Sequence, residues 1–156
     1  MRLSIVAVGR LGHGPERALV EDYLKRLAWP ASVREIADRR ARDPAERRRR
    51  ETKRLLQAVP AGARIVALDR RGRTLSSEAF ARRLGDWREG GVGELAFLIG
   101  GPEGLEPELL ERAELVLSLG PMTWPHALAR AMLAEQLYRA HSILSGHPYH
   151  RGAARN

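Results

Sequence analysis

The chain contains no cysteine, which excludes disulfides and thiolate metal sites and makes a reducing cytoplasm the expected compartment. Lysine is nearly absent as well, because Lys25 and Lys53 are its two occurrences and arginine supplies the rest of the positive charge. Long apolar runs are also missing. The run at residues 3–8 is too short for a signal peptide or a membrane span, so we expect a first buried strand there and no membrane segment.

A length of 156 residues fits one domain with a genuine core, and the 44% apolar and 29% charged residues are typical of globular proteins. The formal net charge is +8. A preference for arginine codons explains the choice of cation but not the excess of cations over anions. Such an excess favours a phosphate-rich partner, because bound cations release its counterions. Nucleic acid is the expected partner, and an acidic protein or a membrane surface is the alternative.

Short apolar runs rich in β-branched residues alternate along the chain with amphipathic patterns of helical period. The predicted strands are residues 3–8, 32–36, 64–68, 94–99 and 115–119. The predicted helices are residues 16–27, 43–58, 76–87, 107–112 and 125–145. This alternation predicts a single α/β domain, residues 1–156, with a parallel sheet covered by helices on both faces. Residues 152–156 are expected to be a flexible tail.

A glycine-rich segment follows the predicted strand at residues 94–99 and reads Leu-Ile-Gly-Gly-Pro-Glu-Gly-Leu over residues 98–105. Ligands of open α/β sheets bind beyond the carboxyl ends of strands, and adjacent glycines let the backbone approach a ligand closely. The segment matches neither the dinucleotide fingerprint nor the phosphate loop. The alternative is a tight turn without a ligand.

A second irregular segment follows the predicted strand at residues 115–119 and reads Leu-Gly-Pro-Met-Thr-Trp-Pro-His over residues 119–126. Its glycine and prolines favour irregular backbone, whose N–H and C=O groups are free to contact a ligand. Met122 and Trp124 can form apolar walls for an adenine or thioether-type ligand. The alternative is a loop whose tryptophan packs on the core.

The last predicted helix carries two polar pairs at a spacing of four, so each pair shares one helix face. These are His126 with Arg130 and Glu135 with Arg139. A pair such as Glu135 and Arg139 is typically solvated and contributes little to stability. The apolar face of this helix is wider than a surface helix needs, which indicates packing against a second copy of the chain.

The segment at residues 147–151 reads His-Pro-Tyr-His-Arg. No carboxylate or cysteine lies near its two histidines in the sequence, so no metal site is expected. Its tyrosine, histidine and arginine side chains can stack on a base and pair with phosphate, and a disordered end is the alternative. Upstream, the arginines between Arg39 and Arg50 form a cationic stretch that we expect to attract RNA without reading its sequence.

Taken together, these motifs resemble the RlmH family, also called YbeA, of ribosomal RNA large-subunit methyltransferases in the SPOUT superfamily. The similarity runs from residues 5–9 through residues 23–26, 98–105 and 123–126 to residues 135–140 and 147–150. Several separated motifs in the right order are a more specific signal than any one of them. Trp124 and the many arginines of residues 39–50 depart mildly from the family pattern.

The resemblance implies an S-adenosylmethionine-dependent enzyme that methylates N3 of a pseudouridine in 23S ribosomal RNA within the assembled ribosome. It also implies a homodimer and a C-terminal trefoil knot, an exception to the rule against threaded chains that periodicity cannot reveal. By matching position, it implies cofactor contacts at Leu68, Gly100, Gly101, Leu119, Gly120, Pro121, Met122, Thr123 and Trp124.

Methylation at N3 requires removal of the ring proton and stabilisation of the anionic ring that results. The candidate catalytic residues are His126, Arg130, Glu135 and His150. His126, Glu135 and His150 are the candidate bases, Arg130 can stabilise the negative charge or hold a phosphate, and the sequence does not select one base or exclude deprotonation by solvent. The candidate RNA-binding residues are Arg139, Tyr149 and Arg151. The alternative function is a non-catalytic ribosome-binding factor on the same fold, against which the intact glycine and Thr-x-Pro-His segments argue. A small-molecule nucleotide enzyme would leave the basic charge unexplained.

Overall fold

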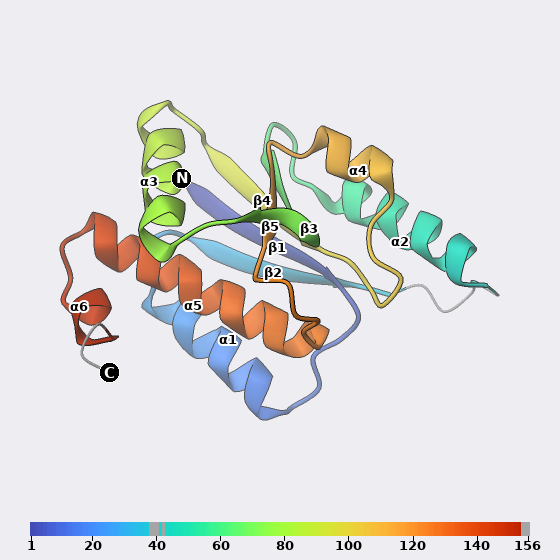
Figure 1. The fold of residues 1–156 in the computed structure, drawn as a ribbon, viewed down its shortest axis with the longest axis horizontal. Coiled ribbons are helices and arrows are strands. Elements are labelled where there is room, and N and C mark those ends of the chain that lie inside the picture. The colour runs from blue at the N-terminus through green and yellow to red at the C-terminus, as the bar shows by residue number, and fades with distance from the viewer. Residues whose placement is uncertain (38–40, 42, 154–156) are drawn as a thin grey trace.

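The computed structural model describes residues 1–37, 41 and 43–153, and within them one five-stranded sheet lies between two layers of helices (Figure 1). The strands are β1 (Arg2–Val8), β2 (Ala31–Ile36), β3 (Arg64–Thr74), β4 (Glu94–Ile99) and β5 (Leu115–Ser118). The helices are α1 (Pro15–Arg26), α2 (Pro44–Ala58), α3 (Ser77–Glu89), α4 (Pro107–Arg112), α5 (His126–Leu144) and α6 (Tyr149–Ala153). Neighbouring strands are parallel in the order β2-β1-β4-β3-β5, so the predicted α/β class is confirmed.

The alternation of side chains along each strand builds two separate cores. On β1, Leu3 and Ile5 point to the layer formed by α1, α3 and α5, whereas Val6 and Val8 point to α2 and α4 (Figure 1). Both faces of the sheet are therefore covered, which explains why the strands read as continuous apolar runs. Full burial of each such side chain contributes about 1.5–3 kcal/mol to stability.

Local capping sets the starts of the helices that surround the site. Asp43 accepts a hydrogen bond of 2.8 Å from the backbone N–H of Glu46 at the start of α2, and Ser76 accepts one of 3.1 Å from Ala79 at the start of α3. Pro125 stands immediately before the first residue of α5. These starts agree with the predicted helices to within a residue or two.

Strand β3 is longer than predicted, because it continues to Thr74 rather than ending at Leu68. Both Leu68 and Arg73 pair with Leu117, so residues 69–72 bulge out and the strand returns across β5. A Cβ on Gly72 would lie 2.6 Å from the carbonyl oxygen of Val116, so this crossing requires glycine. Residues 69–74 are polar, so no apolar pattern predicts that the strand continues through them. The extension depends on pairing with β5, which is distant in sequence.

The C-terminal segment forms the short helix α6, where the sequence suggested an irregular polar end. Gly152 and Ala153 are the last residues of α6, so the helix reaches into the segment expected to be a flexible tail. Residues 154–156 lie outside the described part of the chain. None of the helices among the described residues has both the length and the apolar character needed to cross a membrane.

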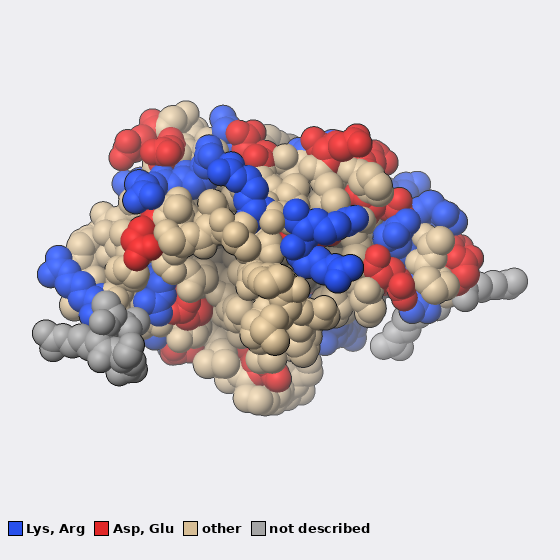
Figure 2. Space-filling view, in the orientation of Figure 1, with Lys and Arg blue, Asp and Glu red and all other residues tan. Residues whose placement is uncertain are grey.

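On the face shown in Figure 2, the basic side chains do not form one continuous surface, although the net charge is +8. Figure 2 shows acidic side chains beside basic ones around the rim of the molecule, with uncharged residues in the centre of this face. Ion pairs such as Arg64–Glu114 at 3.2 Å belong to this mixed rim. Cations that have no acidic neighbour are therefore the better candidates for binding a phosphate-rich partner.

Candidate functional site

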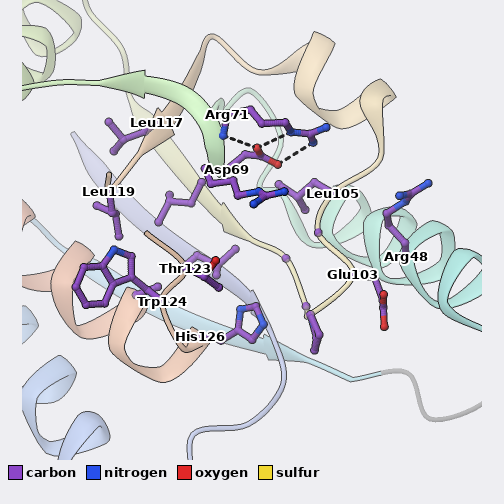
Figure 3. Close-up of a pocket in the computed structure, with 18 of the residues that line it drawn as sticks. Arg48, Asp69, Arg71, Glu103, Leu105, Leu117, Leu119, Thr123, Trp124 and His126 are labelled. Atoms are coloured by element: carbon purple, nitrogen blue, oxygen red, sulfur yellow. Dashed lines mark hydrogen bonds and ion pairs between the residues drawn. The ribbon is translucent and has the colours of Figure 1, made fainter. Parts of the chain in front are cut away.

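A cavity of about 550 Å³ opens at the carboxyl edge of the sheet, where β3, β4 and β5 meet their loops (Figure 3). Residues from three segments line it: residues 68–71, most of the glycine loop (residues 100–106) and most of the β5–α5 loop (residues 119–125). The carboxyl ends of neighbouring parallel strands share one edge, so these segments necessarily come together. The volume lies in the range of small-molecule sites.

Eight of the nine residues predicted to contact the cofactor line this cavity: Leu68, Gly100, Gly101, Leu119, Gly120, Met122, Thr123 and Trp124. Pro121 belongs to the same loop but does not line the cavity. Trp124 is 38% exposed, so the alternative in which its ring packs into the core does not hold. The role of these residues as cofactor contacts stays a prediction, but the structure brings them to one place.

Side chains of helix α2 hold the glycine loop in position. The Nε of Arg48 donates a hydrogen bond of 2.6 Å to Glu106, whose backbone N–H donates one of 3.1 Å to the Oγ of Thr52. The residue before Arg48, Arg47, lies 3.8 Å from the carboxylate of Glu103. The loop that lines the cavity therefore has side-chain contacts with α2 in its middle, at Glu103, and at its end, at Glu106.

A buried carboxylate lies directly against the glycine loop. Glu51 is 4% exposed, and a Cβ on Gly101 would lie 2.5 Å from its Oε2 and 3.1 Å from the side chain of Val8. A Cβ on Gly100 would lie 2.9 Å from the side chain of Leu105. A side chain at either position would therefore force neighbouring groups of the chain to shift, whether or not a ligand approaches them.

These contacts change the interpretation of the arginine stretch between Arg39 and Arg50. Arg47 and Arg48 have acidic partners on the glycine loop, and Arg50 lies 3.6 Å from Glu46 on its own helix. Attraction of RNA is therefore not the whole role of the stretch. Arg39, Arg40 and Arg42 lie outside the described residues.

Sequence reasoning missed an acidic turn at the end of the first half of β3. Asp69 accepts hydrogen bonds of 2.9 and 3.0 Å from the guanidinium of Arg71 and one of 2.9 Å from its backbone N–H (Figure 3). The side-chain hydrogen bonds from Arg71 hold the pKa of Asp69 below its usual value. The sequence feature that could have revealed this turn is an aspartate directly after the apolar strand at residues 64–68.

Among the catalytic candidates, His126 is the one that lines the cavity. It is the first residue of α5 and is partly buried beside the β5–α5 loop. Burial, assisted by the positive charge of Arg130, lowers the pKa of His126 below its ordinary value of 6.5. The imidazole is therefore neutral at neutral pH and has a nitrogen available to accept a proton.

Arg130 does not line the cavity, and its guanidinium is buried among backbone carbonyls. The residue is 2% exposed and donates hydrogen bonds of 2.7 Å to the carbonyl of Val8, 2.8 Å to that of Gly9 and 2.9 Å to Glu35. This arrangement ties α5 to the ends of β1 and β2. The structure does not support the predicted role of Arg130 in stabilising charge on the substrate or holding a phosphate; it supports a role in positioning the helix that carries His126.

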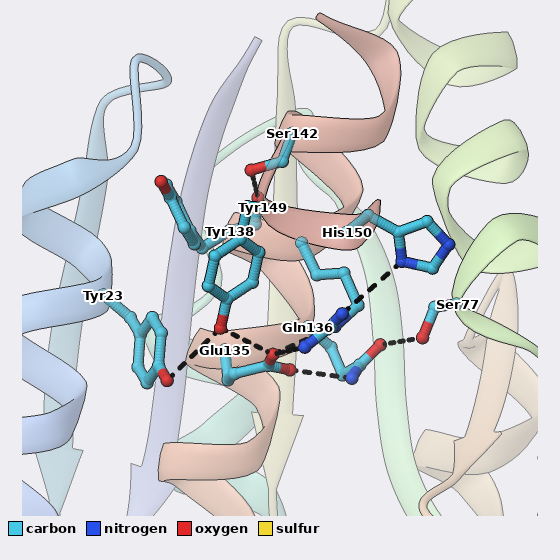
Figure 4. A network of polar contacts seen from close by, with 9 residues as sticks. Tyr23, Ser77, Glu135, Gln136, Tyr138, Ser142, Tyr149 and His150 are labelled. Atoms are coloured by element: carbon cyan, nitrogen blue, oxygen red, sulfur yellow. Dashed lines mark hydrogen bonds and ion pairs between the residues drawn. The ribbon is translucent and has the colours of Figure 1, made fainter. Parts of the chain in front are cut away.

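Glu135 and Arg139 form a second polar cluster with the C-terminal segment (Figure 4). Glu135 accepts hydrogen bonds from the guanidinium of Arg139 and one of 3.0 Å from the hydroxyl of Tyr149. The Glu135 and Arg139 side chains are 18% and 15% exposed, so their interpretation as a solvated surface pair was wrong. Burial and the hydrogen bonds to Tyr23 and Glu135 raise the pKa of Tyr149.

His150 completes this cluster from α6. Its Nε2 lies 2.9 Å from Glu78 on α3, and its Nδ1 lies 3.4 Å from the guanidinium of Arg139. Next to it, the Tyr149 and Tyr138 rings meet edge to face with centroids 4.7 Å apart. Arg151 is exposed. The end of the chain is thus docked on α5, where the sequence allowed a disordered end.

Within one chain, the cavity with His126 lies apart from the polar cluster around Glu135. Glu135 is nine residues beyond His126 on α5, a rise of roughly 13 Å along the helix axis. Neither Glu135, Arg139, Tyr149 nor His150 lines the cavity. In the part of the chain that the structure describes, no group of three or more His, Asp or Glu side chains is arranged to hold a metal ion.

Comparison with known proteins identifies the family. The family model described as "Predicted SPOUT methyltransferase" matches residues 1–150. The chain is 56% identical over 151 residues to Ribosomal RNA large subunit methyltransferase H of Rhodospirillum centenum, covering 97% of this chain and 99% of that relative. It is 52% identical to the protein of the same name from Paramagnetospirillum magneticum, with the same coverage of both chains. The chain therefore belongs to the SPOUT methyltransferase family.

Proposed function

We propose that this protein transfers a methyl group from S-adenosylmethionine to N3 of a pseudouridine in 23S ribosomal RNA, acting on the assembled ribosome. The names of the similar proteins support the class of reaction and the ribosomal RNA substrate. The observation that carries the proposal is the convergence of eight of the nine predicted cofactor residues on one cavity at the carboxyl edge of the sheet.

The residues present suit this cofactor. The glycine loop and the β5–α5 loop offer main-chain groups that are not committed to a helix or strand, and Leu105 and Leu117 add apolar lining. When bound, S-adenosylmethionine supplies a methyl group that is already activated by its sulfonium. The chain itself then needs to orient donor and acceptor and to manage the proton of the acceptor nitrogen.

His126 is the best placed residue to accept that proton. It lines the cavity, and its lowered pKa keeps the imidazole unprotonated at neutral pH. Glu135 and His150 are instead held by partners within the C-terminal cluster. We therefore propose His126 as the general base and Arg130 as the residue that fixes the start of α5.

A homodimer is part of the proposal. Large apolar side chains are exposed around the start of α5 and on the adjacent α1: Met122 at 69%, Leu19 at 45%, Trp124 at 38% and Leu128 at 37%. A second copy packed on this face would bury them. It would also offer a way for the cluster around Glu135, which lies apart from the cavity within one chain, to reach the cavity of the other.

The trefoil knot and the cytoplasmic location also belong to this proposal. Strand β5 pairs with β3 both before and after the bulge at residues 69–72. This pairing supports a path in which the chain passes the loop formed by that bulge, as a knot requires. The absence of cysteine supports a reducing compartment.

The test is methyl transfer from cofactor carrying a labelled methyl group. Purified protein is incubated with assembled 70S ribosomes, with isolated large subunits or with free 23S RNA, and the labelled nucleoside is identified by mass spectrometry. We expect label on N3 of a pseudouridine and the highest yield with assembled ribosomes. Binding to ribosomes without any transfer would support a non-catalytic ribosome-binding factor instead.

A further inference from the structure

Three arginines line the cavity, and they differ in their partners. Arg48 is paired with Glu106, and Arg71 is paired with Asp69 through both its guanidinium and its backbone N–H. Arg70 also lines the cavity and is exposed, and among the described residues its guanidinium has no ion pair or side-chain hydrogen bond, although its charge helps Arg71 to lower the pKa of Asp69. One guanidinium at the cavity mouth is therefore available for an incoming anion.

The backbone that carries Arg70 is held firmly. The Oγ of Ser118 donates a hydrogen bond of 3.2 Å to the carbonyl of Arg70, and Arg73 pairs with Leu117 where β3 returns across β5. Between them, Gly72 packs on the backbone of Val116. The segment is thus fixed to β5 at several points.

Arg73 is the second unpaired cation of the same segment. It is exposed, and its guanidinium has no ion pair within the described part of the chain. Figure 2 shows basic side chains gathered over the end of β3 on the face turned to the viewer. The segment held against β5 thus presents two guanidinium groups without an ion pair, three residues apart, one of them at the cavity itself.

We propose that Arg70 and Arg73 bind phosphates of the RNA strand whose target base enters the cavity. This inference rests on the proposed RNA substrate and assigns residues to its recognition. A guanidinium fork matches a phosphate in two parallel hydrogen bonds. An extended polyanion engages both arginines at once, whereas the single carboxylate of a cofactor in the cavity engages Arg70 alone. The exposure of both side chains fits a polymer that passes over the surface.

The test uses Arg70→Gln, Arg73→Gln and the double variant in the full-length protein. Affinity for purified 70S ribosomes is measured over a series of salt concentrations, and affinity for S-adenosylmethionine is measured by calorimetry. We expect each single change to weaken ribosome binding by about tenfold and to reduce the slope of log affinity against log salt by about one. Cofactor affinity should stay unchanged.

Arg64→Gln is the matched control, because Arg64 is an exposed arginine at the opposite end of the same strand. It should bind ribosomes as the unmodified protein does. Arg70→Lys should restore part of the affinity and all of the salt slope. Thermal unfolding of every variant shows whether the fold is kept.

Two results would overturn the proposal. A loss of cofactor affinity with unchanged ribosome binding would assign Arg70 to the cofactor carboxylate, and unchanged affinity for both would leave the arginines without a role. Failure of the proposed function is a separate observation, since it appears as the absence of methyl transfer by the unmodified protein. The comparison of ribosome affinities would still decide the role of the arginines.

Discussion

Arg48 of α2 and Glu106 of the glycine loop are joined by a hydrogen bond of 2.6 Å, although 58 residues separate them in sequence. Their side chains are 41% and 21% exposed, so the pair itself contributes modestly to the free energy of unfolding. The pair matters for the position of the glycine loop, because it fixes Glu106 at the end of this loop while the other residues of the loop line the cavity. Helix α2 is therefore a support of the candidate cofactor site.

Thr52→Val tests this support. Thr52 is 3% exposed and accepts a hydrogen bond from the backbone N–H of Glu106, so valine leaves that partly buried donor without this partner. We expect a loss of about 1–3 kcal/mol in stability and weaker binding of S-adenosylmethionine. Denaturant unfolding and calorimetry measure the two effects. Lys53→Gln, one residue further on the exposed side of α2, should change neither, and equal values for both variants would contradict the role of Thr52.

Gly101→Ala should damage the glycine loop from within. The added Cβ would lie 2.5 Å from the carboxylate of Glu51, which is too deeply buried to move aside freely. We expect destabilisation by about 1–3 kcal/mol, together with loss of cofactor binding. Gly93→Ala is the control, because a Cβ there meets no atom within 4 Å. If both variants unfold at the same temperature, Glu51 does not constrain the loop.

Tyr149→Phe should loosen the C-terminal segment without unfolding the domain. The change removes the hydroxyl that donates to Glu135 but keeps the ring that packs on Tyr138. We expect a cost of about 1 kcal/mol and faster amide exchange in α6. Hydrogen exchange followed by mass spectrometry localises the effect, and unchanged exchange in α6 would show that the hydroxyl does not hold the segment.

Truncation after Pro148 separates the two groups of site residues. It removes Tyr149, His150 and Arg151 but leaves the cavity and its lining. Methylation should be abolished while the affinity for S-adenosylmethionine stays nearly intact. Calorimetry and transfer of a labelled methyl group measure the two properties, and an equal loss of both would reject an RNA-facing role for this segment.

Stability should fall on the acid side of neutrality because of two histidines. Burial lowers the pKa of His126 and His141 below their ordinary value of 6.5, with Arg130 and Arg88 as the next contributors. A base whose pKa is lower in the folded state stabilises the fold fully above its unfolded pKa, and this contribution is lost as the pH falls from 6.5 through the lowered value. Thermal unfolding measured between about pH 8 and pH 5 should show the decrease. His141→Gln should reduce it, and an identical pH dependence in that variant would refute the assignment.

Much of the candidate site was accessible from the sequence because its signals are local. The glycine pair after residues 94–99 and the irregular segment at residues 119–126 are visible as patterns, and the family resemblance points to the same positions. The local pattern of each segment nevertheless allowed a simple turn. Their meeting in one cavity decides in favour of a site, and this meeting follows from the order of the strands.

By itself, the sequence determined the alternation of strands and helices, the helix starts near residues 43 and 76, and the two loops at the sheet edge, because period and capping act over a few residues. Tertiary structure alone decided the burial of Arg130, the support of the glycine loop by α2, the return of β3 across β5 and the docking of α6. Each of these depends on a partner far away in the chain. A polar side chain looks the same in sequence whether it is solvated or satisfied by such a partner, so the fold must bring the two together before its role is visible.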